Sequence, residues 1–598
     1  MRSQTQPTEV FLATTALEEF WDTSKPIVFL GEWCLLYSRR SYWAALGGTL
    51  LESPYKDTNS SELSYKYIDS LYEETLSIIS EKLNLIHNKN FSNRYWRILI
   101  GPWLLSYLSA TYDRFLHVKT ALTSYPKITT IRLSEKYFLT PKDTLDFSCL
   151  LTSDCYNLQI YSKIIVNFGV KSEAKEIKVF SNTLYKKLLK NSRSRKIISF
   201  GIKLFAKLSS KWNRTIILRS TYFSRSTEAK FAFFRFGRIL LSWAQTDPTP
   251  CFDIDFQKRN ALKNINIGDG EYEKCLTKLL FEDIPICFIE GYSLIEKCAS
   301  DNFPMQSSAI FSANSWYYDE TFKQWSADHA EKGTVLLGTQ HGGNYGSLKI
   351  MPYENHEISI VDFYYSWGWT GGKAKEKLIP MPSTKLINRN VIGASNSKKE
   401  ILWVATSSPR YLVQLPFLPE YYREYLEWQT RFTKFLPPEI LTEIRFRPHY
   451  ENYDWGTVER VKDCIPNIQI ESWTTPFQKS LENCKLYVCD HLSTTFTEAL
   501  AANKPTILFW NPITNPLRAE AESYFHVLRE NGVLFDSPET AASALIAVYE
   551  NVEVWWNDER RQQAVKLFCL QFARTDANAG ALWVDELIRV SELRSVLY

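Results

Sequence analysis

The feature that most constrains the fold is a strand–loop–helix–strand pattern over residues 486 to 509. An apolar run ends at Asp490, a short helical run follows three hydroxyl residues, and a second apolar run completes the unit. Strands joined through a helix lie parallel, so the pattern predicts a parallel sheet. The hydroxyl residues Ser493, Thr494 and Thr495 are good helix caps, and the free backbone N–H groups beside them suit an anion. The alternative is an ordinary turn with a hydroxyl cap.

The same alternation extends over the C-terminal part of the chain. Helical stretches separate further apolar runs, which predicts a Rossmann-like domain over residues 401 to 557. Its predicted strands are residues 401–405, 443–447, 468–471, 486–489, 506–509 and 533–535. Pro, Ser, Asn and Lys become frequent before it, which predicts a linker over residues 386 to 400. Residues 558 to 598 are expected to form C-terminal helices.

At 598 residues the chain is too long for one core, so a second domain is expected before the linker. Residues 1 to 385 are predicted to form an N-terminal Rossmann-like domain with helical insertions over about residues 55 to 215. Its predicted strands are residues 10–14, 27–30, 215–220, 286–290, 308–311, 334–337 and 358–364. Helical periodicity covers residues 61–85, 94–115 and 143–165, with a break at Gly101 and Pro102. The predicted fold class is α/β, with the two domains facing a cleft.

Composition narrows the class of protein. A net charge of +4 gives no reason to expect nucleic acid as a partner. The 11 cysteines form no C-x-x-C pair, which predicts reduced thiols in a cytoplasmic protein, and the eight histidines form no H-x-x-H pair, so no metal site is expected. The polar N-terminus does not resemble a signal peptide, and the longest apolar run, residues 98 to 108, is too short to span a bilayer.

A basic amphipathic segment interrupts the N-terminal part. Residues 179 to 226 contain no acidic residue, and cations such as Lys186, Lys187 and Lys190 alternate there with apolar residues. This pattern is typical of docking on an anionic membrane surface, and the alternative is a solvated helical hairpin with a positive face. The expected location is therefore the cytoplasm, with peripheral contact at the inner face of the plasma membrane.

Two candidate site loops follow predicted strands of the N-terminal domain, where ligands of open α/β sheets bind. The first is a glycine-rich loop in which His341 offers a neutral base or a phosphate partner, and Gly342, Gly343 and Asn344 bring the backbone close to an acceptor. The second carries Glu32, a competing candidate for the base. The plainer alternatives are an idle loop histidine and a solvent-facing loop acid.

Two further candidate loops follow strands of the C-terminal domain. Arg447 ends one strand and His449 lies at its tip, and together they suit a phosphate; the alternative is a surface strand with an arginine ladder. Ser407 and Ser408 form a small hydroxyl loop after the first strand of that domain. Glu498, one turn into the helix after the three hydroxyl residues, is placed to hold a ribose hydroxyl.

These residues carry a resemblance. The order R-P-H, then D-x-x-S-T-T-x-x-E-A-L, then K-P-T-I resembles the donor half of GT-B glycosyltransferases. The most similar kinds are bacterial capsule and lipopolysaccharide enzymes, including Kdo and sialic-acid-type transferases, and the teichoic-acid glycerophosphotransferases. In those enzymes H-P and S-S or S-T motifs hold the nucleotide phosphate, whereas this chain has Pro448 before His449.

Over nearly its whole length the chain also resembles a family of transferases from bacterial O-antigen and surface-polysaccharide loci. The segments that carry this second resemblance are F-L-A-T-T at 11–15, G-E-W at 31–33, W-R-I-L-I-G-P-W at 96–103, Q-H-G-G-N-Y-G at 340–346 and the S-T-T loop.

The resemblance implies a metal-independent glycosyltransferase of GT-B-like fold. Its co-substrate would be a nucleotide-sugar donor, with no other cofactor, and its acceptor a glycan or lipid-linked glycan of the O-antigen, lipopolysaccharide or capsule type. The residues implied for the departing phosphate are Arg447, His449, Ser493, Thr494 and Thr495, and His341 or Glu32 would deprotonate the acceptor. The alternatives are a CDP-polyol phosphotransferase of teichoic-acid type and a non-catalytic nucleotide-sugar- or glycan-binding protein.

Overall fold

The computed structural model describes residues 9–177, 215–235, 238–242, 250, 252–263, 265–372, 375–387, 391–395 and 399–593. Most of the basic segment expected at residues 179 to 226 lies outside these ranges. The described strands form three parallel sheets, one of five strands and two of six.

The C-terminal sheet contains all six strands predicted from the sequence. Its order is β14-β13-β12-β15-β16-β17. The strands are β12 (Ile401–Val404), β13 (Ile444–Arg447), β14 (Gln469–Ile470), β15 (Leu486–Cys489), β16 (Thr506–Phe509) and β17 (Leu534–Phe535). The chain winds outward in both directions from β12, as in a dinucleotide-binding fold, so the order switches between β12 and β15. The register pairs Val404 with Cys489 at that switch.

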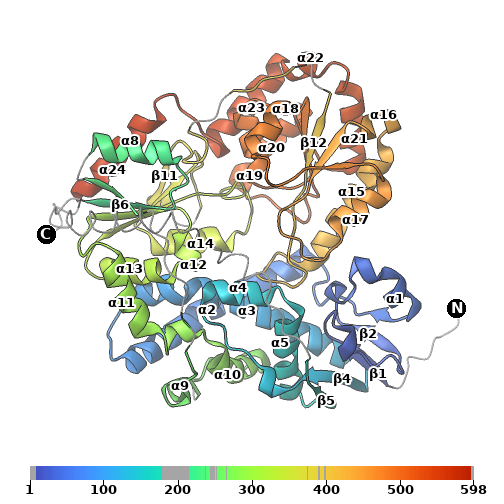
Figure 1. Cartoon of the computed structure of the whole chain (residues 1–598), viewed down its shortest axis with the longest axis vertical. Coiled ribbons are helices and arrows are strands. Elements are labelled where there is room, and N and C mark those ends of the chain that lie inside the picture. The colour runs from blue at the N-terminus through green and yellow to red at the C-terminus, as the bar shows by residue number, and fades with distance from the viewer. Residues whose placement is uncertain are drawn as a thin grey trace.

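The second six-stranded sheet belongs to the N-terminal half. Its order is β11-β10-β9-β8-β6-β7, and every pair is parallel. The strands are β6 (Ile216–Arg219), β7 (Ile239–Leu241), β8 (Ala309–Ser312), β9 (Val335–Thr339), β10 (Phe363–Ser366) and β11 (Leu378–Pro380). The predicted α/β fold class, with two Rossmann-like sheets in a GT-B-like arrangement, is confirmed by this pair (Figure 1).

The third sheet has five strands and is separate from the two Rossmann-like sheets. Its order is β3-β2-β1-β4-β5, and its strands are β1 (Val10–Ala13), β2 (Ile27–Phe29), β3 (Thr49–Leu50), β4 (Ile128–Leu133) and β5 (Ser172–Lys175). The first two strands expected for the N-terminal Rossmann-like sheet therefore pair with one another in a separate sheet. In Figure 1 this sheet lies at the lower right, below the C-terminal domain.

Long helices connect the small sheet to the rest of the molecule. They are α2 (Thr58–His87), α3 (Asn93–Ser124), α4 (Thr144–Leu151) and α5 (Asp154–Asn167). The break predicted at Gly101 and Pro102 is wrong, because α3 continues through both residues, which are fully packed by neighbouring helices. Gly101 gives the space for this packing, since a Cβ there would come within 2.6 Å of the His356 ring.

In the N-terminal half one further strand prediction is wrong and another begins too early. Residues 286 to 288 form a single 3-10 turn rather than a strand. Residues 358 to 360 end helix α14 (Pro352–Ile360), and the strand begins only at Phe363. Both segments are buried runs of apolar residues, and apolar runs this short do not distinguish a strand from a buried helical turn.

The C-terminal helices divide between the two halves. Helix α23 (Glu559–Phe572) packs against α20 (Ala519–Glu530) of the C-terminal domain through Phe568 and Phe525, whose ring centroids are 5.1 Å apart. Helix α24 (Ala579–Leu593) returns to the N-terminal half, where it lies beside β6 and α8 (Arg225–Phe234) (Figure 1). Its Trp583 ring lies 5.5 Å from Phe311 of β8 and completes the core on that side of the sheet.

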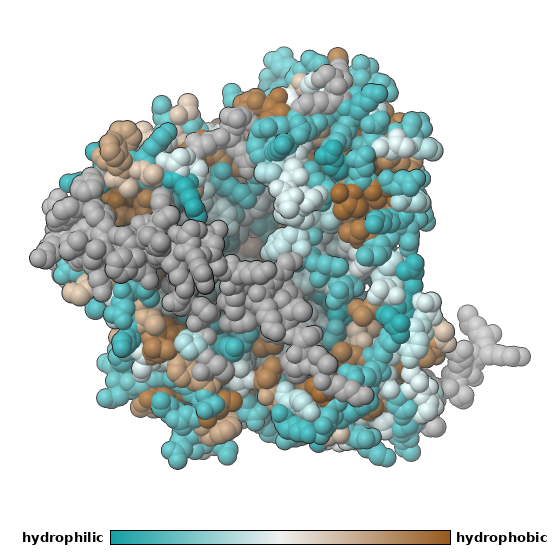
Figure 2. Space-filling model, in the orientation of Figure 1, coloured by the Kyte–Doolittle hydropathy of each residue, from teal (hydrophilic) through white to brown (hydrophobic). Residues whose placement is uncertain are grey.

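The outer surface is mainly hydrophilic in the view of Figure 2, where hydrophobic residues outside the grey region occur in small separate groups. The strands β1, β6, β8, β12, β15 and β16, by contrast, are buried at every position. In the described part of the chain, no helix combines the length and the apolar character that a bilayer crossing requires.

Candidate active site

Two of the loops predicted to bind ligands meet in the structure. The backbone N–H of Gly343, in the loop after β9, donates to Thr494 Oγ1 at 3.1 Å. A Cβ on Gly343 would overlap the Ser493 carbonyl oxygen, so only glycine permits this approach. The N-terminal glycine loop and the C-terminal hydroxyl loop are therefore in direct contact.

The hydroxyl loop leads into helix α19 (Thr494–Ala501), which starts at the N-cap residue Ser493. The Ser493 side chain makes no capping bond and lies 3.0 Å from Thr495 Oγ1 instead. Backbone N–H groups of the first helical turn have no partner within their own helix, so this end favours a negative charge. The arrangement suits the phosphate that the sequence led us to expect here.

Glu498 lies one turn into the same helix and forms an ion pair. Its carboxylate, 5% exposed, lies 2.8 Å from Lys385 Nζ in the segment between β11 and β12. The Lys385 ammonium also lies 5.8 Å from the centre of the Tyr222 ring, which is itself 5.8 Å from the His341 ring. This pair places a cation, Lys385, beside the candidate site. Lys385 was not identified from the sequence. The ribose-binding role expected for Glu498 stays a prediction.

His341 follows β9 and is held by a buried carboxylate. Its Nε2 lies 2.9 Å from Glu357 Oε1 on helix α14, and its side chain is 20% exposed. Glu357 is inaccessible to solvent and also accepts hydrogen bonds from the hydroxyls of Tyr317 and Tyr345. No sequence pattern points to Glu357, because it lies 16 positions after His341 without a motif that joins them.

Glu32, the competing candidate for the base, lies elsewhere. It forms an ion pair of 2.6 Å with Arg423 of helix α15 (Pro419–Phe435), in the C-terminal domain. Burial raises the pKa of Glu32, and the nearby carboxylates of Glu420 and Glu427 add to that rise while Arg423 opposes it. Neither Glu32 nor His341 lines the two cavities at the switch point described next. In the described part of the chain the two candidates have different partners, Arg423 for Glu32 and Glu357 for His341.

A cavity of about 380 Å³ lies at the switch point of the C-terminal sheet. Ser407 and Ser408, after β12, and His491, after β15, line it together with Asn344 from the glycine loop. Its wall is rich in aromatic side chains, which are Tyr353, Phe417, Tyr421, Tyr422, Tyr425, Trp428 and Trp510. Aromatic walls with a few polar groups suit a sugar or a nucleobase.

A second cavity, of about 490 Å³, continues from the first. Both are lined by Tyr353, Ser408 and Phe417, and the second extends to Tyr450 and Glu451 after β13. Four of the predicted loops, after β9, β12, β13 and β15, therefore converge on one hollow region between the domains.

Asp490 and His491 form a buried pair at the end of β15. Asp490 accepts hydrogen bonds from Trp403 Nε1 at 2.9 Å and Gln429 Nε2 at 2.8 Å, and its other oxygen lies 3.0 Å from His491 Nδ1. Burial opposes protonation of His491, but Cys489 and Asp490 outweigh it and raise the pKa of this histidine to about 10. His491 is thus a cation that lines the first cavity, and it was not among the residues predicted from the sequence.

Arg447 and His449 take different roles in the structure. The Arg447 guanidinium is buried, donates to Glu471 Oε2 at 2.7 Å and lies 4.5 Å from the centre of the Trp473 ring. To bind a donor phosphate, the Arg447 guanidinium would have to leave its ion pair with Glu471. His449 accepts a bond from the backbone N–H of Glu451 at 3.2 Å, and burial lowers its pKa, with a smaller contribution from His491 in the same direction.

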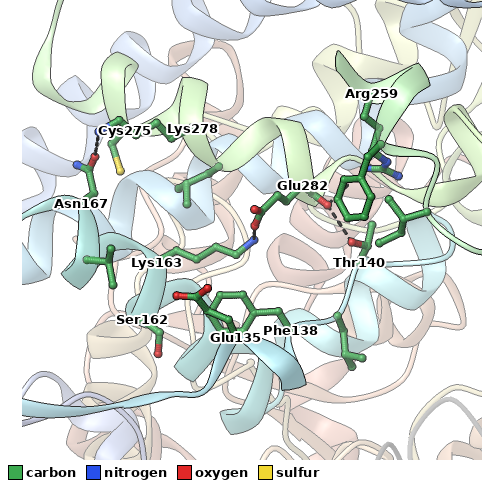
Figure 3. Close-up of a pocket in the computed structure, with 15 residues that line it drawn as sticks. Glu135, Phe138, Thr140, Ser162, Lys163, Asn167, Arg259, Cys275, Lys278 and Glu282 are labelled. Carbon is green, nitrogen blue, oxygen red and sulfur yellow. Dashed lines mark hydrogen bonds and ion pairs between the residues drawn. The ribbon is translucent and has the colours of Figure 1, made fainter. Parts of the chain in front are cut away.

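A third cavity, of about 500 Å³, lies away from this region, between residues 135–140, α5, helix α9 (Phe256–Lys263) and helix α10 (Glu271–Asp283). Figure 3 shows Lys163 and Glu282 facing one another across it. Lys163 lies 2.8 Å from Glu282, and Lys278 donates to Asn167 at 2.8 Å. None of the residues predicted from the sequence lines this cavity, so it is not part of the candidate site.

No group of three His, Cys, Asp or Glu side chains is suited to hold a metal ion in the part of the chain that the structure describes. Positive charge near the candidate site comes from Lys385, His491 and the N-terminus of α19.

Comparison with known protein families assigns the chain to a class of transferases. A family model described as LIC12162 family transferase matches residues 10–587. Three solved structures are similar at low identity. Staphylococcus aureus MnaA with UDP is 11% identical with a TM-score of 0.36, covering 64% of this chain and 97% of that protein. Acinetobacter baumannii MurG is 12% identical with a TM-score of 0.32, covering 63% and 99%.

The third structure is Anabaena HepE in complex with UDP-glucose, which is 10% identical with a TM-score of 0.33, covering 63% of this chain and 99% of that protein. TM-scores of this size add nothing to the fold assignment, which rests on the strand order. No curated protein sequence matches the chain.

Proposed function

The chain belongs to the LIC12162 family of transferases, and we propose that it transfers a sugar from a nucleotide-activated donor to a bacterial surface glycan of the O-antigen, lipopolysaccharide or capsule type. The observation that carries the proposal is the contact between Gly343 and Thr494. It joins a loop with a base to a helix N-terminus suited to phosphate, and transfer from a phosphorylated donor needs both groups in one place.

The donor would occupy the C-terminal side of the site. The N-terminus of α19, with Ser493, Thr494 and Thr495, would bind the phosphate of the nucleotide. His491, cationic beside Asp490, would stabilise the negative charge that develops as the nucleotide departs. The nucleoside or the sugar would fill the aromatic cavity lined by Ser407 and Ser408.

The acceptor would occupy the N-terminal side. Its hydroxyl group would lose a proton to the His341 imidazole while its oxygen forms the new bond to the sugar carbon. The bond from that carbon to the donor phosphate breaks, and the nucleotide leaves with the electron pair. Gly342, Gly343 and Asn344 would let the backbone approach the acceptor. A CDP-polyol donor of teichoic-acid type would use the same phosphate site, so the donor class is left to experiment.

The test has two steps. Incubation with CMP-, UDP- and GDP-sugars and with CDP-polyols, each with and without glycan acceptor, identifies the donor from the nucleotide released. His341→Ala should then lower turnover by about 10²–10⁴-fold, the usual contribution of a general base, with donor affinity near that of the wild type. His526→Ala is the matched control, because His526 is 62% exposed on α20 and touches no site residue.

Three results would contradict the proposal. Binding of a nucleotide-sugar without any turnover would indicate a binding protein. Loss of donor affinity in His341→Ala would make the glycine loop a phosphate cradle and transfer the base role to Glu32. Release of a nucleoside monophosphate from a CDP-polyol would indicate a phosphotransferase.

The same proposal includes peripheral contact with an anionic membrane, which rests on the sequence of the basic segment. Wild-type protein should bind anionic vesicles at low salt, at about 1 kcal/mol for each engaged Lys or Arg. Charge reversal at Lys186, Lys187 and Lys190 should abolish binding while turnover of a water-soluble acceptor is kept. Failure of the wild type to sediment with such vesicles would reject the membrane contact.

A further inference from the structure

The carboxylate beside His341 has an unusual set of neighbours. Glu357 lies on α14 with no solvent exposure, and three tyrosine hydroxyls donate to it. Tyr317 and Tyr345 each bond Oε1 at 2.8 Å, and Tyr364 bonds Oε2 at 2.9 Å. A buried carboxylate is costly unless its oxygens are bonded, and these three donors meet that requirement before His341 is counted.

These contacts determine where the His341 proton lies. Nε2 is 2.9 Å from Glu357 Oε1 and 3.0 Å from the Tyr345 hydroxyl oxygen. Since the Tyr345 proton points to Glu357, both oxygens present lone pairs to Nε2, and a lone pair on that nitrogen would be repelled by both. Nε2 is therefore the protonated nitrogen, and Nδ1 carries the lone pair. Among the residues that the structure describes, none bonds Nδ1.

We propose that Glu357 is a positioning residue, which fixes the tautomer and the orientation of His341 so that Nδ1 accepts the proton of the acceptor hydroxyl. This inference rests on the proposed function, because it assigns the acceptor proton to one atom of the base. Glu357 itself touches no substrate, since it is wholly enclosed. As His341 gains the proton, the carboxylate stabilises the imidazolium that forms.

Kinetics of Glu357→Gln give the first test. The amide keeps the shape of the side chain but removes its charge. We expect kcat to fall by about 10²–10⁴-fold, the range of losing a working base, with KM for the donor unchanged. The acid limb of the pH–rate profile should move to lower pH, because a neutral amide no longer favours the protonated imidazole. A merely structural role would not move that limb.

The matched control is Glu290→Gln. Glu290 is 4% exposed and pairs with Arg259 at 2.7 Å, so this substitution also removes a buried charge, but far from His341. It should lower thermal stability and leave kcat intact at temperatures below its melting transition. An unchanged kcat in folded Glu357→Gln, or an equal loss in Glu290→Gln, would overturn the proposal.

A second measurement does not depend on turnover or on the folding of Glu357→Gln. In ¹⁵N-histidine-labelled wild-type protein at pH 8, the His341 signals, assigned by their loss in His341→Ala, should show a protonated Nε2 and an unprotonated Nδ1. The opposite tautomer, or an equal mixture of both, would overturn the role of Glu357. If His341→Ala keeps full turnover while the expected tautomer is found, the base assignment fails and the Glu357 contact stands, so the two failures are distinguishable.

Discussion

The backbone N–H of Gly343 donates to the Thr494 hydroxyl at 3.1 Å, and this bond links the two Rossmann-like domains at the point where their candidate loops meet. The glycine loop follows β9 of one sheet and the hydroxyl loop follows β15 of the other. In parallel sheets such loops lie at the carboxyl edge, where ligands bind. The contact therefore fixes how far apart a base on one domain and a phosphate site on the other can be.

Replacing Gly343 should separate these groups. Gly343→Ala would force its Cβ against the Ser493 carbonyl oxygen, which belongs to the backbone and cannot rotate away. We expect a stability loss of about 1–3 kcal/mol and a loss of turnover of about 10-fold or more, because both depend on the close approach. Melting temperature and kcat/KM measure the two effects.

Gly342→Ala is the comparison for this prediction. The nearest atom to its added Cβ is Asn344 Oδ1 at 3.2 Å, the end of a side chain that can move. Its effects should be clearly smaller than those of Gly343→Ala. Equal effects of the two substitutions would mean that the loop as a whole, rather than its contact with Ser493, is sensitive.

The Lys385–Glu498 pair should couple the linker segment to α19. Glu498→Gln and Lys385→Met are each expected to destabilise the protein, and together to cost less than the sum, with a coupling energy of about 0.5–3 kcal/mol. A double-mutant cycle of chemical unfolding measures this coupling. Additive losses of stability would mean that the ion pair does not link the two segments.

The ribose role expected for Glu498 makes a separate prediction. Glu498→Gln protein should no longer bind a nucleotide more tightly than the deoxyribose analogue of that nucleotide, as measured by calorimetry.

His449 is expected to contact the donor phosphate. His449→Ala should weaken nucleotide binding by about 1–3 kcal/mol, the cost of one charge-assisted hydrogen bond. Burial lowers the pKa of His449, so its ring is neutral at pH 7. Wild-type affinity should therefore rise as the pH falls through that pKa and the ring gains charge, and the alanine variant should lack this rise. Calorimetry at several pH values measures the nucleotide affinity of both proteins. An unaltered affinity in His449→Ala would show that His449 is not part of the site.

His356 should make the protein acid-sensitive. It is buried on α14, both ring nitrogens lack a partner among the described residues, and burial lowers its pKa to about 3. Its pKa in the unfolded chain is about 6.5, so the unfolded state binds the proton more readily. The stability that depends on a neutral His356 is complete above about pH 6.5 and falls by about 1.4 kcal/mol for each pH unit below it.

His356→Leu should flatten this dependence. Urea unfolding at pH 7.5 and pH 5 gives the comparison, and about 2 kcal/mol of the wild-type difference is expected to disappear in the variant. His526→Leu serves as control, because His526 is exposed and should leave the dependence unchanged. A variant with the wild-type pH profile would show that water reaches His356 in the folded protein.

The C-terminal sheet could be predicted from the sequence and the N-terminal half only in part. The central C-terminal strands β12, β15 and β16 are nearly continuous apolar runs between helices, because strands covered on both faces need no polar side. Strand prediction failed where another type of element is buried as fully as a strand. At Ile286–Phe288 a 3-10 turn lies inside the helical core and has the same apolar composition as a strand. The separate five-stranded sheet could not be distinguished, since strand periodicity contains no information on which sheet a strand joins.

The candidate site could also be predicted only in part. Glycines, hydroxyls and histidines at predicted strand ends indicated which loops matter, because the carboxyl edge of a parallel sheet gathers them. Glu357 and Lys385 were not found, as their partners His341 and Glu498 lie 16 and 113 positions away and only the fold brings them together. Arg447 was expected to face a ligand, but its partner Glu471 lies on the adjacent part of the sheet edge, and strand alternation cannot reveal such a pairing.

The return of α24 to the N-terminal half has a consequence for the order in which the protein can be made. Trp583, Leu587 and Val590 complete a core whose other residues, such as Ile216 and Phe311, leave the ribosome hundreds of residues earlier. Until residues 579 to 593 emerge, one side of the sheet from β6 to β11 lacks part of its cover, although Phe231 of α8 is already present. The nascent chain therefore carries an exposed apolar surface through the synthesis of the whole C-terminal domain, and this half is expected to complete its folding last, although its strands are made first.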